Sequence, residues 1–373
     1  MKISCIDIGG TYIKSGVLED GVLTGVEETP TDGGGGARAM LSRVAQLVRQ
    51  TPGVERVGVS TAGEVDARTG VIRLSDNIPG YTGLNPRQIL EGELGLPVAV
   101  ENDVNAAAAG EFAFGAARDE QDFLMVSYGT GVSGAVYTGG RLYRGRAGSA
   151  GEFGGLVTHP EAVDPARQGT GSYERYASTS ALVARVTALY PALTTGRDIF
   201  AHLNDPTIKK EVDAWIREVA CGIISLIHAF DPALVVLGGG IMGEPYILSQ
   251  LERMAAPMVK PSFRGCRVVP AALGNNAGLM GAGRSETMET LFGLRHKSSG
   301  TVRIDGAPVE GPGLDRAVVF QNYALFPWMS ALRNVEFGVE QANKELHRGL
   351  TKAQVSAAAR DYLDRVGMGA AAT

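Results

Sequence analysis

Two short glycine turns, far apart in the chain, contain the residue types that could bind a phosphate. Asp7-Ile8-Gly9-Gly10-Thr11 follows one apolar run, and Gly129-Thr130-Gly131 follows another. Glycine lets backbone N–H groups approach a phosphate closely, and the threonine hydroxyls add donors. Asp7 would repel a bare phosphate, but it can hold Mg²⁺ or its water shell. The two turns together predict a clamp for nucleotide phosphates, although an ordinary glycine hairpin would show the same residues.

Similar strand patterns flank both turns. Residues 3–8, 12–18 and 22–29 read as strands, with Asp20-Gly21 as a hairpin signal between the last two. Residues 122–128 and 132–137 repeat the pattern, and Gly139-Gly140 supplies the second hairpin. The sequence therefore predicts the same strand–turn–strand–hairpin unit twice.

A third group of polar residues, Glu101-Asn102-Asp103-Val104-Asn105, lies between a predicted strand at 97–100 and an alanine-rich helix at 106–114. Four polar residues out of five at a strand-to-helix junction indicate a site beside the sheet edge. In the alternative interpretation, Asn102 or Asp103 simply caps the helix. A cap requires only one such residue, so we favour the site.

The rest of the chain up to about residue 290 alternates strands with helices. Strands are predicted at 54–60, 233–237 and 267–271, and helices at 37–50, 86–94, 174–189 and 209–230. Glu152 lies in a loop of small residues, and Gly238-Gly239-Gly240 ends a buried strand. This alternation predicts an α/β fold with sites at the carboxyl ends of its strands.

Composition excludes several classes of protein. The chain has 373 residues, of which 44% are hydrophobic and 20% charged, and its net charge is −5. An acidic chain is a poor match for nucleic acid as a main partner. The three cysteines form no Cys-x-x-Cys motif, and no apolar run reaches membrane-spanning length. Met1 leads directly into a strand, so we expect a cytoplasmic protein without membrane insertion.

Four blocks occur together in order: residues 7–11, 101–105, 129–154 and 238–240. Over about residues 1–285 they resemble the ROK family of bacterial sugar kinases and repressors. The resemblance implies a two-domain, actin-like ATPase (ribonuclease H-like) fold with a cleft between the domains. We place these domains at 1–118 and 119–290, and the last helix could pack back on the first domain. Repressors of the family carry a DNA-binding helix-turn-helix at the N-terminus. Only six residues precede Asp7, which is too few for such a motif. The resemblance therefore implies the kinase branch of the family.

The resemblance also implies roles for individual residues. The family's catalytic base matches Asp103, which would take the proton of a sugar hydroxyl. The residues expected to contact the sugar are Gly63, Asn77, Asn102, Glu152 and Glu174. Those expected to contact ATP are Asp7 (with Mg²⁺), Gly9, Gly10, Thr11, Lys14, Gly129, Thr130, Gly131, Gly239, Gly240 and Asn276. The implied reaction is ATP-dependent phosphorylation of a hexose or amino-sugar, at the 6-hydroxyl, by a homodimer.

The chain departs from the zinc-containing members of the family. They carry a histidine three residues after the matched glutamate, where this chain has Gly155, and a cysteine cluster where residues 167–172 contain none. We therefore predict no structural zinc and expect nearby His159 to be a surface residue. Zinc-less members include kinases for N-acetylmannosamine, glucose and β-glucosides, so the sugar remains open.

Beyond about residue 290 the sequence changes character. Residues 299–306 and 319–328 resemble the middle of an ABC-transporter ATPase of the nitrate/sulfonate/taurine type, and Gln321 would match its Q-loop glutamine. Residues 332–338 and a predicted helix at 351–366 continue this match. The phosphate loop that should precede it is missing. We interpret 291–373 as a truncated fragment from a fusion or truncation, with a docking role as the alternative.

Three functions follow from these observations. The first is a sugar kinase, which the complete set of blocks at 7–240 favours. The second is an ABC-transporter ATP-binding subunit, which the tail suggests but the missing phosphate loop opposes. The third is a non-catalytic, sugar-sensing ROK protein, which the presence of Asp103 and both glycine turns opposes.

Overall fold

The structure is a computed structural model, and it describes residues 2–31, 35–75, 77–283, 303–304, 307–308, 329–345, 349–365 and 368. The chain divides into two compact units. One comprises Met1–Leu291 and Lys297–Gly300, and the other comprises Phe292–His296 and Thr301–Thr373. The first unit contains two lobes, each built on a five-stranded sheet.

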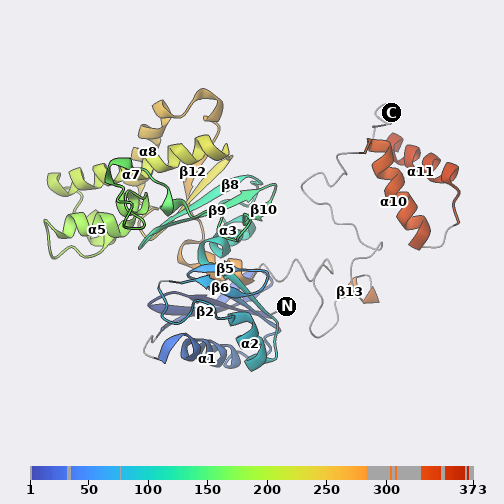
Figure 1. Ribbon diagram of the computed structural model, residues 1–373, viewed down its shortest axis with the longest axis horizontal. Helices are drawn as coiled ribbons and strands as arrows, with labels where there is room; N and C mark the ends of the chain where they lie inside the picture. The colour runs from blue at the N-terminus through green and yellow to red at the C-terminus, as the bar shows by residue number, and fades with distance from the viewer. Residues whose placement is uncertain are drawn as a thin grey trace. The chain divides into compact units, whose positions relative to one another are not determined.

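The sheet of the first lobe has the order β3-β2-β1-β4-β7. Its strands are β1 (Lys2–Ile8), β2 (Tyr12–Glu19), β3 (Val22–Pro30), β4 (Arg56–Thr61) and β7 (Val98–Asn102). β1, β2 and β3 are antiparallel, whereas β4 and β7 run parallel to β1. α1 (Gly36–Arg49) and α2 (Pro86–Leu94) lie on one face of this sheet (Figure 1). Side chains alternate between the two faces of a strand, so Ile6 and Ile8 pack under these helices, while Cys5 joins the cluster on the other face.

The sheet of the second lobe repeats this topology, with the order β10-β9-β8-β11-β12. Its strands are β8 (Phe123–Tyr128), β9 (Val132–Thr138), β10 (Arg141–Tyr143), β11 (Leu234–Gly238) and β12 (Arg267–Pro270). On β8, Leu124 joins the core under the large helices, whereas Phe123 and Met125 pack against α3 (Asp103–Phe114). The sheet is therefore covered on both faces.

The helices of the second lobe lie between β10 and β12 in the chain. They are α4 (Glu174–Ala177), α5 (Thr179–Thr187), α6 (Gly196–Ala201), α7 (Pro206–Phe230) and α8 (Pro245–Met258). The 3-10 turns η2 (Phe153–Gly155), η3 (Pro160–Ala162) and η4 (Pro261–Phe263) lie in the same stretch, and η5 (Gly274–Asn276) follows β12. The predicted helix at 174–189 is wrong at one point. It breaks at Ser178, whose side chain accepts from the Ala181 N–H and starts a new helix. The sequence analysis also missed α6 and α8.

α3 crosses the helical segment 277–283 at very short range. A Cβ on Gly281 would lie 1.6 Å from the Ala106 carbonyl oxygen, and one on Gly110 would lie 2.4 Å from that of Ala277. Only glycine permits this approach, because any side chain would overlap the opposing backbone. Leu279 of the same segment packs on Ile3 of the first sheet. The segment therefore links the end of the second lobe to the core of the first.

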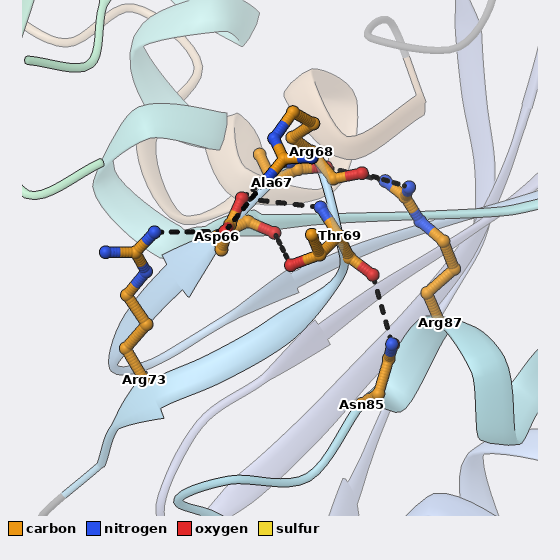
Figure 2. A network of polar contacts seen from close by, with 7 residues as sticks. All are labelled: Asp66, Ala67, Arg68, Thr69, Arg73, Asn85 and Arg87. Atoms are coloured by element: carbon orange, nitrogen blue, oxygen red, sulfur yellow. Dashed lines mark hydrogen bonds and ion pairs between the residues drawn. The ribbon is translucent and has the colours of Figure 1, made fainter. Parts of the chain in front are cut away.

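A small hairpin, β5 (Glu64–Asp66) and β6 (Val71–Leu74), projects from the end of β4. Its turn is fixed by a polar network (Figure 2). Asp66 accepts from the Arg68 and Thr69 N–H groups and from Arg73, while Arg87 of α2 donates to the carbonyls of Ala67 and Arg68. Because these bonds involve backbone on both sides of the turn, they fix the hairpin against α2.

The second unit is described in two pieces. Strands β13 (Arg303–Ile304) and β14 (Ala307–Pro308) form an antiparallel pair. Helices α10 (Ala331–Glu345) and α11 (Lys352–Arg365) pack together, and α11 buries Val355, Ala359 and Leu363. The predicted helix at 351–366 is confirmed by α11. Gln321 and residues 319–328 lie outside the described residues.

Within the part of the chain that the structure describes, no helix has both the length and the apolar character needed to cross a bilayer.

Candidate active site

Five of the predicted site residues line one cavity of about 490 Å³: Asp7, Lys14, Asp103, Gly239 and Gly240. The predicted phosphate-binding residues of the two glycine turns, 9–11 and 129–131, are not among the described residues that line it. Asp7 and Lys14 reach it from the first sheet, Asp103 from α3, and Gly238, Gly239 and Gly240 from the end of β11. A larger hollow of about 1120 Å³ lies between α7, α8 and residues 259–269, but none of the predicted site residues lines it. The structure thus brings together residues from three separate regions of the sequence.

Asp7 lies at the carboxyl end of β1, where it is partly buried. Its Oδ1 accepts a hydrogen bond of 2.7 Å from the Ser60 hydroxyl. Burial raises the pKa of Asp7, and the Ser60 hydrogen bond and the Lys14 charge only partly oppose this effect. A Cβ on Gly278 would lie 3.3 Å from Asp7 Oδ2, so glycine at this position keeps the space beside that oxygen open.

The junction of β7 and α3 places Asn102 and Asp103 at the start of a helix. Asn102 Oδ1 accepts from the N–H groups of Val104 and Asn105, which makes Asn102 the N-cap of α3. Its Nδ2 donates to the Gly63 carbonyl (3.0 Å) and to Asp103 Oδ1 (2.9 Å). The alternative interpretation of Asn102 as a cap is therefore confirmed. The side chain also orients Asp103, and these four hydrogen bonds use its full capacity.

The pKa of the Asp103 carboxyl group is strongly perturbed. Burial raises its pKa to about 6, with further contributions from the negative charges of Asp7 and Glu152. Hydrogen bonds from Val104 N–H and Asn102 oppose the rise. A carboxylate with a pKa near 6 is still ionised at neutral pH and can accept a proton.

Gly63 lies beside Asn102, and Asn77 lies beside the first glycine turn. Gly63 has φ +108°, and a Cβ would meet the Leu74 carbonyl oxygen at 2.6 Å, so the start of the β5–β6 hairpin requires glycine. Its carbonyl holds Asn102, as described above. Asn77 is exposed and lies next to Gly10, whose Cβ would be 3.5 Å from the Asn77 carbonyl oxygen. The predicted sugar-binding Asn77 is therefore adjacent to the first glycine turn.

The predicted sugar ligands of the second lobe are two exposed carboxylates. The pKa of Glu152 is raised, first by partial loss of hydration to the surrounding protein and then by the charges of Glu64 and Glu174. Glu174 Oε2 would lie 2.7 Å from a Cβ on Gly131 and 3.0 Å from one on Gly154. The two glycines thus make room for the Glu174 carboxylate, and Gly131 of the second turn contacts a predicted sugar ligand.

Both glycine turns are closed by their own backbone. Gly9 N–H donates to the Tyr12 carbonyl (2.9 Å), and Gly129 N–H donates to the Gly131 carbonyl (3.0 Å). The side chains of Thr11 and Thr130 are exposed. The predicted pairing of two antiparallel strands around each turn is confirmed by the β1–β2 and β8–β9 ladders.

Near the residues predicted to border adenosine, the cavity lining differs from the prediction at two positions. Gly239 has φ +119°, and a Cβ there would lie 2.2 Å from the Tyr128 carbonyl oxygen. Only glycine therefore lets this loop approach the end of β8 so closely. The neighbouring turn lines the cavity with Asn275 rather than with Asn276. Arg197 also lines the cavity, and the sequence analysis missed it because an arginine in a short polar segment resembles a solvent-exposed residue.

The loop matching the zinc-binding region is closed by protein contacts. Val157 pairs with Ser172, and Tyr173 N–H donates to the Leu156 carbonyl. His159 was expected to be a surface residue, but it is only partly exposed. Its ring is half-buried, stacks on Tyr176 with centroids 3.6 Å apart, and lies 3.6 Å from Glu218. Among the described residues, no three His, Cys, Asp or Glu side chains gather as metal ligands would.

Comparisons with known proteins agree with this arrangement. The family model described as "ROK family" matches residues 3–284. The β-glucoside kinase of Listeria innocua is 34% identical over 295 residues, which cover 76% of this chain and 96% of the relative. The crystal structure of the ROK hexokinase from Thermus thermophilus has a TM-score of 0.68 at 34% identity, covering 78% of this chain and 99% of that one.

A second solved structure is the ROK family glucokinase from Streptomyces griseus in complex with glucose and AMPPNP. It has a TM-score of 0.67 at 30% identity and covers 76% of this chain and 98% of that one. These matches account for the first unit, and none supports the predicted ABC-transporter resemblance of residues 291–373. The two-domain, actin-like α/β fold predicted for the first unit is supported. From the family model and the relatives together, the chain belongs to the ROK family.

Proposed function

We propose that this ROK-family protein transfers the γ-phosphoryl group of MgATP to the 6-hydroxyl group of a glucose-type sugar, with Asp103 as the general base. It is a sugar kinase. One observation carries the assignment of the base: the Asp103 carboxylate lies in the same cavity as Asp7, Lys14 and the glycine loop after β11. The glucokinase structure with glucose and AMPPNP supports the choice of substrates.

Asp103 would act through its free carboxylate oxygen. Both hydrogen bonds that the structure gives to its side chain end on Oδ1, from Asn102 Nδ2 and Val104 N–H. We therefore assign Oδ2 to the sugar hydroxyl. As the sugar oxygen forms its bond to the γ-phosphorus and the bond to ADP breaks, the hydroxyl proton passes to Oδ2. Phosphoryl transfer requires mainly such positioning and charge neutralisation.

Asn102 has a different role from direct sugar binding in this proposal. Its amide is fully used by the helix cap, the Gly63 carbonyl and Asp103. It holds the base in place, while Glu152, Glu174 and Asn77 remain the residues that we assign to the sugar hydroxyls. Their exposed side chains have acceptor capacity to offer.

The residues at the end of β1 fit a magnesium ion that arrives with ATP. Asp7 is an oxygen donor, and glycine at 278 keeps the space beside its Oδ2 open. Burial without a matching cation disfavours a carboxylate, and Mg²⁺ with its water shell would offset this cost. When bound, Mg²⁺ neutralises charge on the phosphates. Lys14, 3.3 Å from the Asn275 carbonyl oxygen, adds a second positive charge on the same side.

The test is a coupled ADP-release assay with glucose, cellobiose, N-acetylglucosamine and N-acetylmannosamine, each with 6-deoxyglucose as the control acceptor. We expect turnover with at least one sugar, a 6-phosphate product, and none with 6-deoxyglucose. Sugar binding without turnover would favour the sensor alternative. Elemental analysis of the purified protein tests the expected lack of zinc, and size-exclusion chromatography tests the expected homodimer.

A further inference from the structure

One loop of the second lobe makes side-chain contacts with the first lobe on both sides of the base. The loop, residues 144–151, follows β10 and leads to Glu152. Arg144 Nη2 donates to Glu101 Oε2, and Ser149 Oγ donates to Glu64 Oε2 at 2.8 Å. Glu101 precedes Asn102, the last residue of β7, and Glu64 begins β5 directly after Gly63, whose carbonyl accepts from Asn102. Both contacts therefore lie next to a group that bonds Asn102.

Glu101 is the more buried of the two acceptors, with a side chain only 6% exposed. Its Oε1 accepts from the Asn102 N–H (3.0 Å) and from Asn105 Nδ2 (3.2 Å). Its Oε2 is held by Arg144, the only cation within 4 Å of this carboxylate among the described residues. A buried carboxylate is stable when it is paired, and removing its cation leaves an uncompensated charge.

A chain of contacts then leads to the base. Arg144 holds Glu101, Glu101 holds the Asn102 backbone, and the Asn102 side chain holds both Asp103 and the first turn of α3. We propose that Arg144 is a positioning residue for phosphoryl transfer, which aligns Asp103 through Glu101 and Asn102 when the lobes adopt the separation seen here. This inference rests on the proposed function only in naming Asp103 as the base.

The arrangement explains why an arginine suits this position. The guanidinium is half-exposed on a loop, so it contributes little to either core. It can, however, make a directional hydrogen bond that an apolar side chain cannot replace. A misplacement of the base of about 1 Å can cost roughly 10²-fold in rate. Loss of Arg144 should therefore reduce turnover of the folded protein, in addition to the stability lost when Glu101 is left unpaired.

The test compares Arg144→Met, Arg144→Lys and Glu101→Gln with Arg146→Met in the full-length protein. Arg146 is an exposed arginine of the same loop, so its replacement removes the same charge without breaking the Glu101 contact. For Arg144→Met we expect kcat lowered about 10- to 100-fold, KM for ATP within twofold, and a lower melting temperature, because the buried Glu101 carboxylate loses its cation. Arg144→Lys should recover much of the loss, and Arg146→Met should behave as wild type. Equal kcat values for Arg144→Met and Arg146→Met would overturn the inference.

A second measurement needs no substrate and separates this inference from the proposed function. In hydrogen-exchange mass spectrometry, the amides of Val104 and Asn105 should exchange faster in Arg144→Met than in Arg146→Met, because both donate to the Asn102 cap. Unchanged exchange would reject the positioning role even if no sugar were phosphorylated. A wild-type protein without activity on any sugar would instead reject the proposed function, whatever the exchange result.

Discussion

The two sheets of the first unit have the same strand order but differ in what their strand ends carry. In the first sheet, Asp7 is the penultimate residue of β1, and β7 ends at Asn102, which Asp103 follows as the first residue of α3. In the second, the position matching Asp7 on β8 is Ser127, and β11 ends in Gly238-Gly239-Gly240. One backbone topology therefore supplies carboxylates on one side of the cavity and bare backbone on the other.

This difference separates two chemical tasks. Carboxylates can accept a proton or hold a cation, whereas glycine backbone can approach a nucleotide without repelling its phosphates. The comparison teaches that the fold sets where strand ends meet and that a few side chains decide what each end does. Exchanging or removing those side chains should separate the two tasks.

The largest effect is expected for Asp103→Asn. The amide oxygen can still accept from Asn102 Nδ2 and Val104 N–H, but it cannot take a proton. We expect kcat to fall by about two to four orders of magnitude, with sugar binding largely retained. Steady-state kinetics and calorimetry with the sugar check this. A kcat within a few-fold of wild type would rule out Asp103 as the base.

The same variant should be more stable than wild type at neutral pH. Because folding raises the pKa of Asp103 to about 6, its favourable contribution to stability is present below the unfolded pKa and is lost as pH rises through 6. Replacing the charge with an amide should therefore stabilise the protein by on the order of 2 kcal/mol at pH 7.5 and by much less at pH 4. Melting temperatures at the two pH values provide the control that the variant is folded.

The next largest effect is expected for Asp7→Ser. This substitution introduces into β1 the residue type that β8 has at the matching position, Ser127. Serine cannot hold Mg²⁺ as a carboxylate does, so kcat/KM for MgATP should fall roughly 10- to 100-fold. Ser127→Ala, at the matching position of the other sheet, should have a much smaller effect. Magnesium titrations of both variants make the comparison. An equal fall of kcat/KM for MgATP in Asp7→Ser and Ser127→Ala would mean that the Asp7 carboxylate has no special role in binding MgATP.

The pH dependence should follow the base. Since Asp103 must be ionised to accept the proton and its pKa is about 6, kcat/KM should be level above pH 7 and fall up to tenfold per pH unit below 6. A pH profile of the wild-type protein from 4.5 to 8.5 measures this limb. An acid limb near pH 4 would mean that the base is not perturbed by burial and by Asp7.

Much of this arrangement could be predicted from sequence because its signals are local. Glycine turns between apolar runs identified both strand pairs, and the Glu101–Asn105 block identified the catalytic junction. Arg144 gave no signal, since its partner Glu101 is distant in sequence and the contact depends on how the lobes meet. His159 was misassigned for a similar reason: its partners Tyr176 and Glu218 come from other elements.

Asn102 shows a different limit of sequence reasoning. The two interpretations, site residue and helix cap, were treated as alternatives, but one amide performs both tasks because it has two acceptor and two donor positions. The pattern alone cannot show this, since it depends on the Gly63 carbonyl reaching Asn102 from a neighbouring strand end.

A smaller effect is expected for Arg197→Ala, which tests the side of the cavity that we assign to the nucleotide. This exposed arginine lines the cavity near the glycine loop, so it should contribute a solvent-screened contact with the nucleotide. We expect KM for ATP to rise about two- to fivefold, with kcat and KM for the sugar unchanged. Arg38→Ala, at an exposed position on α1, is the matched control. A change in KM for the sugar alone would place Arg197 with the sugar ligands instead.

The smallest effect is expected for removal of residues 291–373, which follow the two five-stranded sheets in the chain. The ROK family match ends at residue 284, and the described helices of the second unit contain their own contacts. α11 buries Val355, Ala359 and Leu363, and Asn343 exchanges two hydrogen bonds with the Leu350 backbone. A chain ending at Thr290 should therefore keep kcat and both KM values within twofold of the full-length protein and melt within a few degrees of it. Kinetics and calorimetry of the two proteins side by side are the measurement. A large loss of activity or stability would show that the two sheets do not form the complete kinase and that the tail is part of it.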